Sequence, residues 1–117
     1  MNTKIKFAYK DVPYVLEFDR MSVKTLEANG FSVEEFLKKP MLNIELAFAG
    51  AFIKNHRKTK QTTIDEIFSK MKDKQKLVES LVLMIEETYS SLFEEPEGDE
   101  GNVDWEVEDL SPMASHK

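Results

Sequence analysis

The chain has 117 residues, of which 41% are hydrophobic, enough for one domain with its own core. It contains no cysteine, which excludes disulfides, thiolate nucleophiles and cysteine zinc sites. The net charge of −6 is unevenly placed. Residues 94–117 carry nine acidic residues and one lysine, whereas residues 1–93 carry 15 basic and 13 acidic residues. This composition predicts a compact, nearly neutral domain, 1–93, followed by an acidic tail, 94–117.

The first predicted element is a β-hairpin. Apolar residues alternate with other residues in 4–9 and again in 14–18, and residues 10–13 between them have turn character. A hairpin alone is only marginally stable in water, so we expect this one to pack on the rest of the domain.

Two short helices are expected next. Ser22 is placed to cap the first helix, and Gly30 is placed to end it in a left-handed conformation. Ser32 and Glu35 have the spacing of a capping box at the start of the second helix. Two aromatic residues flank this cap and can form a hydrophobic staple: Phe31 and Phe36.

Three longer helices complete the predicted domain. Pro40 stops the second helix and suits the first turn of a third, which runs from about residue 41 to about residue 55. Thr63 and Glu66 have capping-box spacing and open a fourth helix, and a fifth covers about 74–93. The predicted fold class is therefore α+β and mostly helical, with an N-terminal hairpin, about five helices and a disordered acidic tail.

No segment has the pattern of a signal peptide or a membrane span. The N-terminus alternates charged and apolar residues, and the longest apolar stretch, 46–53, is far too short to cross a bilayer. We therefore expect a soluble protein.

The tail is not uniform. Residues 94–101 combine high charge with proline and glycine, so this stretch is predicted to be disordered. Residues 102–108 alternate, with Val103, Trp105 and Val107 on one face and acidic residues on the other. Two interpretations stay open for this strand-capable segment: it adds to an exposed sheet edge, of its own chain or a partner's, or it stays solvated.

Residues suited to catalysis or to metal binding are sparse. His56 and His116 have no partner at a helical ligand spacing, and the four glycines are scattered, so no phosphate-binding loop is present. The sequence predicts no enzyme, no cofactor and no metal site.

One basic cluster occurs, comprising Lys54, Arg57, Lys58 and Lys60. Its cations could contact phosphates, but cations near a helix C-terminus are also favoured by the helix dipole. The nearly neutral domain and the acidic tail disfavour nucleic acid as a partner. A small regulatory protein that binds nucleic acid through the 54–60 loop is the alternative function.

Two helical segments carry more apolar residues than one buried stripe requires. The apolar residues of the third helix do not fit one narrow stripe: Met41, Leu42, Ile44, Leu46, Phe48, Phe52 and Ile53. Residues 81–85 are apolar on every face, so most of the residues in both segments should form the core. Small residues at 47 and 49–51 leave a thin section where another element can approach closely. Some of the surplus could instead face a partner or a second copy of the chain. The candidate partner-binding residues are Phe48, Phe52, Leu83, Met84, Val103, Trp105 and Val107.

Taken in chain order, these features resemble a family of small proteins from long-tailed phages. The similar segments in the first third of the chain are 4–7 (KIKF), 14–20 (YVLEFDR), 22–27 (SVKTLE) and 30–32 (GFS). Further along, the similar segments are 50–52 (GAF) before the basic stretch, 64–67 (IDEI) and 101–106 (GNVDWE). Together they resemble the tail assembly chaperones of siphophages that infect Gram-positive bacteria.

The resemblance implies a helical chaperone encoded between the tail tube protein and the tape measure protein. Such a chaperone coats the apolar tape measure protein, keeps it soluble and recruits tail tube subunits. It acts in the host cytoplasm, is absent from the finished virion, and is often extended by a ribosomal frameshift. We expect the third and fifth helices to bind the client or a second copy of the chain, forming a homo-oligomer. The tail would give solubility or contact the tube subunit.

Overall fold

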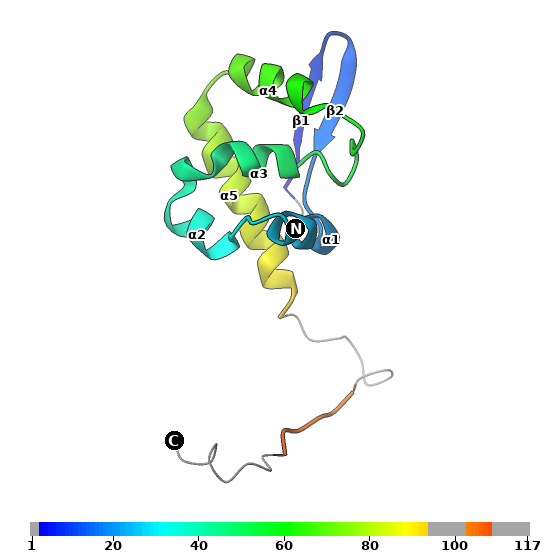
Figure 1. Cartoon of the computed structure of the whole chain (residues 1–117), viewed down its shortest axis with the longest axis vertical. Coiled ribbons are helices and arrows are strands. Elements are labelled where there is room, and N and C mark those ends of the chain that lie inside the picture. The colour runs from blue at the N-terminus through cyan, green and yellow to red at the C-terminus, as the bar shows by residue number, and fades with distance from the viewer. Residues whose placement is uncertain (1–2, 94–102, 109–117) are drawn as a thin grey trace.

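The computed structural model describes residues 3–93 and 103–108, and in this part of the chain a hairpin precedes five α-helices and one short 3₁₀ helix (Figure 1). The elements are β1 (Ile5–Tyr9), β2 (Val12–Leu16), α1 (Arg20–Ala28), α2 (Val33–Lys38), η1 (Pro40–Leu42), α3 (Ile44–Gly50), α4 (Gln61–Lys70) and α5 (Lys74–Ser91). The predicted α+β, mostly helical fold is confirmed. The stretch predicted to be disordered, 94–101, lies outside the described residues.

The hairpin turn is tighter than the sequence suggested. Two residues, Lys10 and Asp11, connect the strands with φ of 51° and 66°. Two positive φ values in a two-residue turn match the right-handed twist of the strands. Pro13, expected in the turn, instead lies in β2 opposite Ala8.

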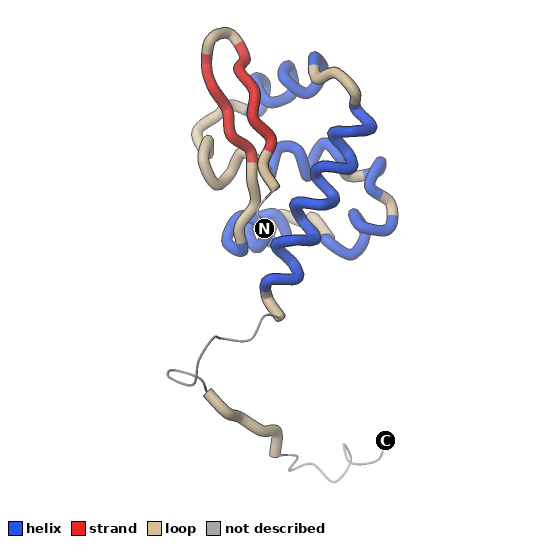
Figure 2. The backbone as a smooth tube through the Cα atoms, turned by 180° about the vertical axis from the view of Figure 1, so that it is seen from behind, coloured by secondary structure: helices blue, strands red, loops and turns tan. Residues whose placement is uncertain are grey.

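The inner face of the hairpin packs on the helices. Tyr14 and Leu16 are buried, and Phe7 stacks on Tyr14 with ring centroids 5.2 Å apart. Tyr14 also meets the ring of Phe52 edge-on at 5.7 Å. Seen from behind, the two strands lie along one side of the helices, as expected for a hairpin that is not stable alone (Figure 2).

Helix α1 begins at a different cap from the predicted one. Asp19 is the N-cap: its carboxylate accepts from the Ser22 N–H, while the Asp19 N–H donates to Ser22 Oγ, both at 2.8 Å. Ser22 therefore completes a capping box from inside the helix. Gly30 follows the helix with φ of 99°, so its predicted left-handed conformation is confirmed.

Helix α2 begins where the sequence predicted. The Glu35 N–H donates to Ser32 Oγ at 3.1 Å. The rings of Phe31 and Phe36 lie 5.5 Å apart, which is the contact expected of a hydrophobic staple. Both rings are buried, so this local signal also contributes to the core.

Helix α3 is shorter than predicted. The expected helix over 41–55 is divided into η1 and α3, and successive turns follow Gly50 as far as Asn55. A Cβ on Gly50 would lie 2.3 Å from Cδ1 of Leu26, so α1 crosses α3 at the thin section noted in the sequence. Glycine is needed there for this close approach.

Helix α4 begins two residues before Thr63, at Gln61, and its N-cap residue Lys60 makes no side-chain cap hydrogen bond. The capping box predicted for Thr63 and Glu66 is therefore wrong. The Glu66 carboxylate instead accepts a hydrogen bond from the Tyr9 hydroxyl of the hairpin. A long-range contact uses the side chain that the local pattern assigned to the cap.

Helix α5 crosses the whole domain (Figure 1). It begins after Asp73, whose side chain accepts from the Lys76 N–H at 3.1 Å, and it ends close to the predicted boundary. Leu81, Met84 and Ile85 on this helix are buried in the core. In the described part of the chain, no helix combines the length and apolar character needed to cross a membrane.

Candidate partner-binding surfaces

Exposed apolar residues begin in η1 and continue on the outer side of α3. Met41 and Leu42 are each 71% exposed, and Leu46 is 50% exposed. Ala49 and Ile53, which follow Leu46 by three and seven residues, are partly buried on the same side. We call these five residues the α3 strip.

A groove of about 230 Å³ runs beside this strip. Leu46, Ala49 and Ile53 line it, together with Leu26 of α1 and Ile64 of α4. Polar residues also line this groove: His56, Arg57, Thr59 and Gln61. The groove is therefore suited to a partner segment that carries both apolar and polar side chains.

A second apolar surface lies where α5 ends. Three apolar side chains there are exposed: Tyr89, Leu92 and Phe93. Tyr89 and Leu92 line a groove of about 330 Å³ with Val23 of α1. Arg20 holds the two helices together, because its guanidinium donates to the Ser91 carbonyl and to Ser91 Oγ.

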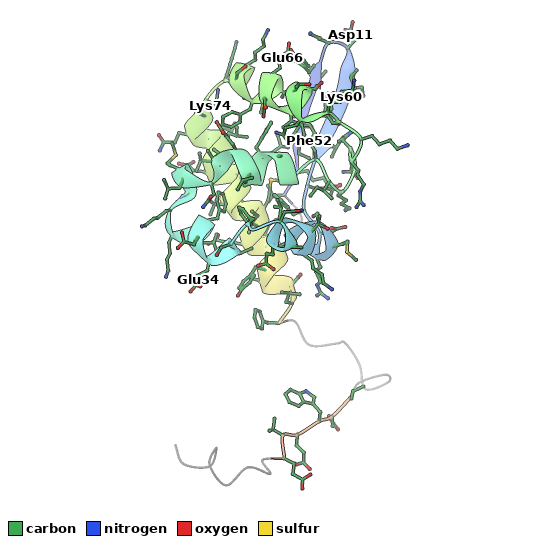
Figure 3. All side chains as sticks on the ribbon, viewed as in Figure 1. Asp11, Glu34, Phe52, Lys60, Glu66 and Lys74 are labelled. Atoms are coloured by element: carbon green, nitrogen blue, oxygen red, sulfur yellow. The ribbon has the colours of Figure 1, made fainter. Side chains whose placement is uncertain are left out.

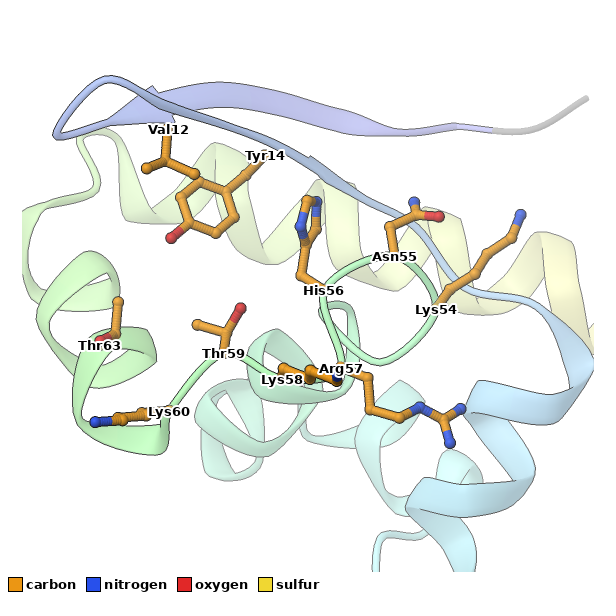
Figure 4. Close-up of a pocket in the computed structure, with 10 residues that line it drawn as sticks. All are labelled: Val12, Tyr14, Lys54, Asn55, His56, Arg57, Lys58, Thr59, Lys60 and Thr63. Atoms are coloured by element: carbon orange, nitrogen blue, oxygen red, sulfur yellow. The ribbon is translucent and has the colours of Figure 1, made fainter.

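The basic cluster surrounds a wide hollow of about 770 Å³ (Figure 4). Lys54 Nζ lies 3.2 Å from the Glu17 carboxylate, which also accepts from Asn55 at 2.7 Å. The Asn55 hydrogen bond and the Lys54 charge lower the pKa of Glu17. Lys54, Arg57 and Lys60 point in different directions rather than toward one point (Figure 4). The arrangement does not focus positive charge on a single anion.

His56 has a structural role at this hollow. Its Nε2 accepts from the Val15 N–H at 2.9 Å, and its ring centroid lies 5.0 Å from that of Tyr14. Residues 3–93 and 103–108 hold no group of three side chains placed to bind a metal ion. His116 lies outside the described residues.

A polar contact ties the tip of the hairpin to α4. The Tyr9 hydroxyl donates to Glu66, and Lys10 Nζ lies 3.3 Å from the same carboxylate. The hydrogen bond to Glu66 raises the pKa of Tyr9, and the same hydrogen bond lowers the pKa of Glu66. Because these groups are satisfied by one another, the cluster is a brace between two elements.

The predicted partner-binding residues divide between core and surface. Phe48, Phe52 and Met84 are at most 2% exposed, so the hypothesis that they face a partner is corrected: they form the core. The Phe48 ring lies 5.3 Å from the rings of both Phe52 and Phe68. In Figure 3, Phe52 lies inside the domain, whereas Glu34 and Asp11 lie at its periphery.

The other four predicted residues are accessible. Leu83 on α5 is 46% exposed, and Val103, Trp105 and Val107 are 79–80% exposed in an extended segment. The structure does not bring these tail residues together with the α3 strip. Val103, Trp105 and Val107 remain candidate partner-binding residues, separate from the α3 strip.

The sequence placed Met41, Leu42 and Leu46 in the apolar surplus of the third helix, but they were not selected as candidate partner-binding residues. Leu46 lies about 200° around the helix from Phe48, so a helical projection separates the two faces. Because both faces are apolar, this projection does not predict which face is buried in the core. Met41 and Leu42 were assigned to the predicted third helix, but they lie in the short 3₁₀ helix that precedes α3.

These observations define a small, mostly helical α+β domain with exposed apolar surfaces. The chain belongs to a family described as a domain of unknown function, DUF5055, which matches residues 1–109. No curated protein and no solved structure matches the chain.

Proposed function

We propose that this protein is a tail assembly chaperone of long-tailed phages. In this role it is a non-enzymatic binding protein that covers the apolar tape measure protein and helps to recruit tail tube subunits. The order of sequence segments that resembles this family supports the proposal, as does the chemistry of the exposed surfaces.

The α3 strip carries the proposal most directly. The core is complete without Met41, Leu42 and Leu46, each of which is at least half exposed. Isolated apolar residues on a surface are ordinary, but a group of exposed apolar residues beside a groove is typical of a protein-binding site. Such a strip can cover part of a long apolar helix of the tape measure protein.

Charge gives the complex its solubility. The tail carries nine acidic residues and one lysine, whereas the domain is nearly neutral. A strong net charge opposes aggregation of a protein that holds an apolar client. The tail therefore keeps a chaperone and its client in solution together.

Co-expression tests the function. The tape measure protein encoded in the same genome is produced with and without this chain, and its soluble fraction is measured. We expect it to be soluble with the chain and aggregated without it. Equal solubility in both cases would refute the proposal.

Nucleic-acid binding through the 54–60 loop is the alternative. The loop lines a wide hollow, but Lys54 is paired with Glu17 and the cations diverge. Binding of DNA at low salt that is lost in an Arg57→Ala/Lys58→Ala variant would favour this alternative.

A further inference from the structure

The two outer edges of the hairpin are not equivalent. The two-residue turn closes on the pair Tyr9 and Val12, which exchange backbone hydrogen bonds in a hairpin of this type. Along an antiparallel pair, these hydrogen-bonded residues alternate with residues whose backbone N–H and C=O groups point away from the partner strand. The outward residues are therefore Lys6 and Ala8 on β1, and Pro13 and Val15 on β2.

The β2 edge is closed by the chain that follows α3. The Val15 N–H donates to His56 Nε2, and the Val15 carbonyl accepts from the Asn55 amide at 3.1 Å. The next outward N–H, that of Glu17, donates to the Ala51 carbonyl at 3.2 Å. Pro13 has no N–H to offer. A further strand cannot pair here.

The β1 edge is open. Among the described residues, no hydrogen bond to the outward backbone groups of Lys6 or Ala8 is present. The side chains of Lys4, Lys6 and Ala8 are exposed, and those of Ile5 and Phe7 on the inner face are partly buried. This edge offers unpaired donors and acceptors, with lysines on its outer face.

Apolar side chains lie next to the β1 edge, between this strand and α5. A groove of about 130 Å³ lies between β1 and the start of α5, and its apolar lining residues are Ile5, Met71 and Leu77. The N–H and Oγ1 of Thr3 both donate to Glu87 at 2.8 Å, which fixes the start of β1 on α5. Leu83, one turn before Glu87, is 46% exposed. A third strand would have apolar side chains to cover.

Val103, Trp105 and Val107 are exposed in this structure, and we propose that residues 103–108 of the same chain fold back and bind to the β1 edge as a third strand. The alternation of this segment complements that of β1 on both faces of the sheet. Its apolar residues would lie over the groove: Val103, Trp105 and Val107. Its acidic residues would lie on the outer face beside Lys4 and Lys6: Asp104, Glu106 and Glu108.

Chain length permits this arrangement. Ten residue steps separate Phe93 from Val103, and they can span at most about 35 Å. The Thr3 contact with Glu87 places the start of β1 within about one helical turn of the end of α5, at Ser91. A tethered segment has an effective concentration in the millimolar range, which favours the tail of the same chain over that of a second copy. The proposal is independent of the chaperone function.

Amide hydrogen exchange of the full chain tests the proposal. We expect the N–H groups of Lys6 and Ala8 to exchange at least about tenfold more slowly than in a Trp105→Ser/Val107→Ser variant. The N–H groups of Phe7 and Tyr9, which lie in the β1–β2 ladder, serve as controls and should not change. Equal exchange of Lys6 and Ala8 in both proteins would overturn the proposal.

A second pair of variants acts on the edge itself. Ala8→Pro removes an outward N–H without removing a ladder hydrogen bond, whereas Ala8→Ser keeps that N–H. Trp105 is the sole tryptophan, so its emission should move to that of N-acetyltryptophanamide in Ala8→Pro and stay blue-shifted in Ala8→Ser. Emission like that of the free amide in the unmodified chain would contradict the docked strand. Protection that rises with protein concentration would assign the edge to a second copy and overturn the intramolecular form.

Discussion

The two faces of α3 have similar apolar chemistry and opposite surroundings. Phe48 is fully buried between aromatic rings, and Leu46, two residues earlier, is half exposed beside a groove. The fold needs the first face, because its loss would open a cavity in the core. The second face is free to bind a partner. A short helix that is apolar all round can therefore serve both the core and a binding surface.

The largest expected effect is on the buried face. Phe48→Ala should lower the free energy of unfolding by about 3–5 kcal/mol, because it leaves a cavity among packed rings. Urea denaturation followed by circular dichroism measures this. A loss below about 1 kcal/mol would contradict the burial of this face.

Gly50→Ala should destabilise the fold by about 1–3 kcal/mol, because the new methyl group would overlap the Leu26 side chain. The cost should be less than additive with that of Leu26→Ala, which makes room for the methyl group. Denaturation of the two single variants and the double variant measures the coupling. Strict additivity would show that α1 and α3 do not meet at this point.

Glu17→Gln should remove part of the acid sensitivity of the fold. The pKa of Glu17 is held below its ordinary value of 4.5, first by the Asn55 hydrogen bond and then by Lys54. A lowered folded-state pKa stabilises the fold above the ordinary value, and this contribution is lost as pH falls through the folded pKa.

At neutral pH we expect Glu17→Gln to cost about 1 kcal/mol, and the fall in stability on acidification to be smaller than in the unmodified chain. Glu34→Gln is the control, because Glu34 forms an exposed pair with Lys38. Its acid profile should match that of the unmodified chain. Identical acid profiles for the two variants would rule out the role of Glu17.

The smallest expected effect concerns the proposed third strand. Lys6→Glu should weaken docking of the tail through repulsion from its acidic face, and adding Glu106→Lys should restore it. Paired charges across exposed strands contribute about 0.2–1 kcal/mol, so the shift in Trp105 emission should be partial. Failure of the second substitution to restore the emission would argue against this facing of the two strands.

Local signals in the sequence predicted much of the fold. Gly30, the Ser32 cap and the contact between Phe31 and Phe36 depend on neighbouring residues and are found as expected. The predicted start of α4 was wrong, because the Glu66 side chain binds Tyr9, which is distant in the sequence, and does not cap the helix. Long-range contacts decide such cases.

The candidate sites were less predictable. The sequence identified Leu83 and the alternating tail segment, both of which are exposed. It could not decide between Leu46 and Phe48, because the inward face of an all-apolar helix is chosen by the elements that pack on it. Which edge of the hairpin is open likewise could not be predicted, because it depends on residues 51–56, which fold back and close the β2 edge.

The most direct measurement compares matched surface variants of the α3 strip in capturing the co-expressed tape measure protein. We expect Leu42→Ser/Leu46→Ser to fold with nearly unchanged stability but to lose the client. Met21→Ser, an exposed apolar residue of α1, should retain it. Undiminished capture by the Leu42→Ser/Leu46→Ser variant would contradict the claim that the α3 strip binds the client.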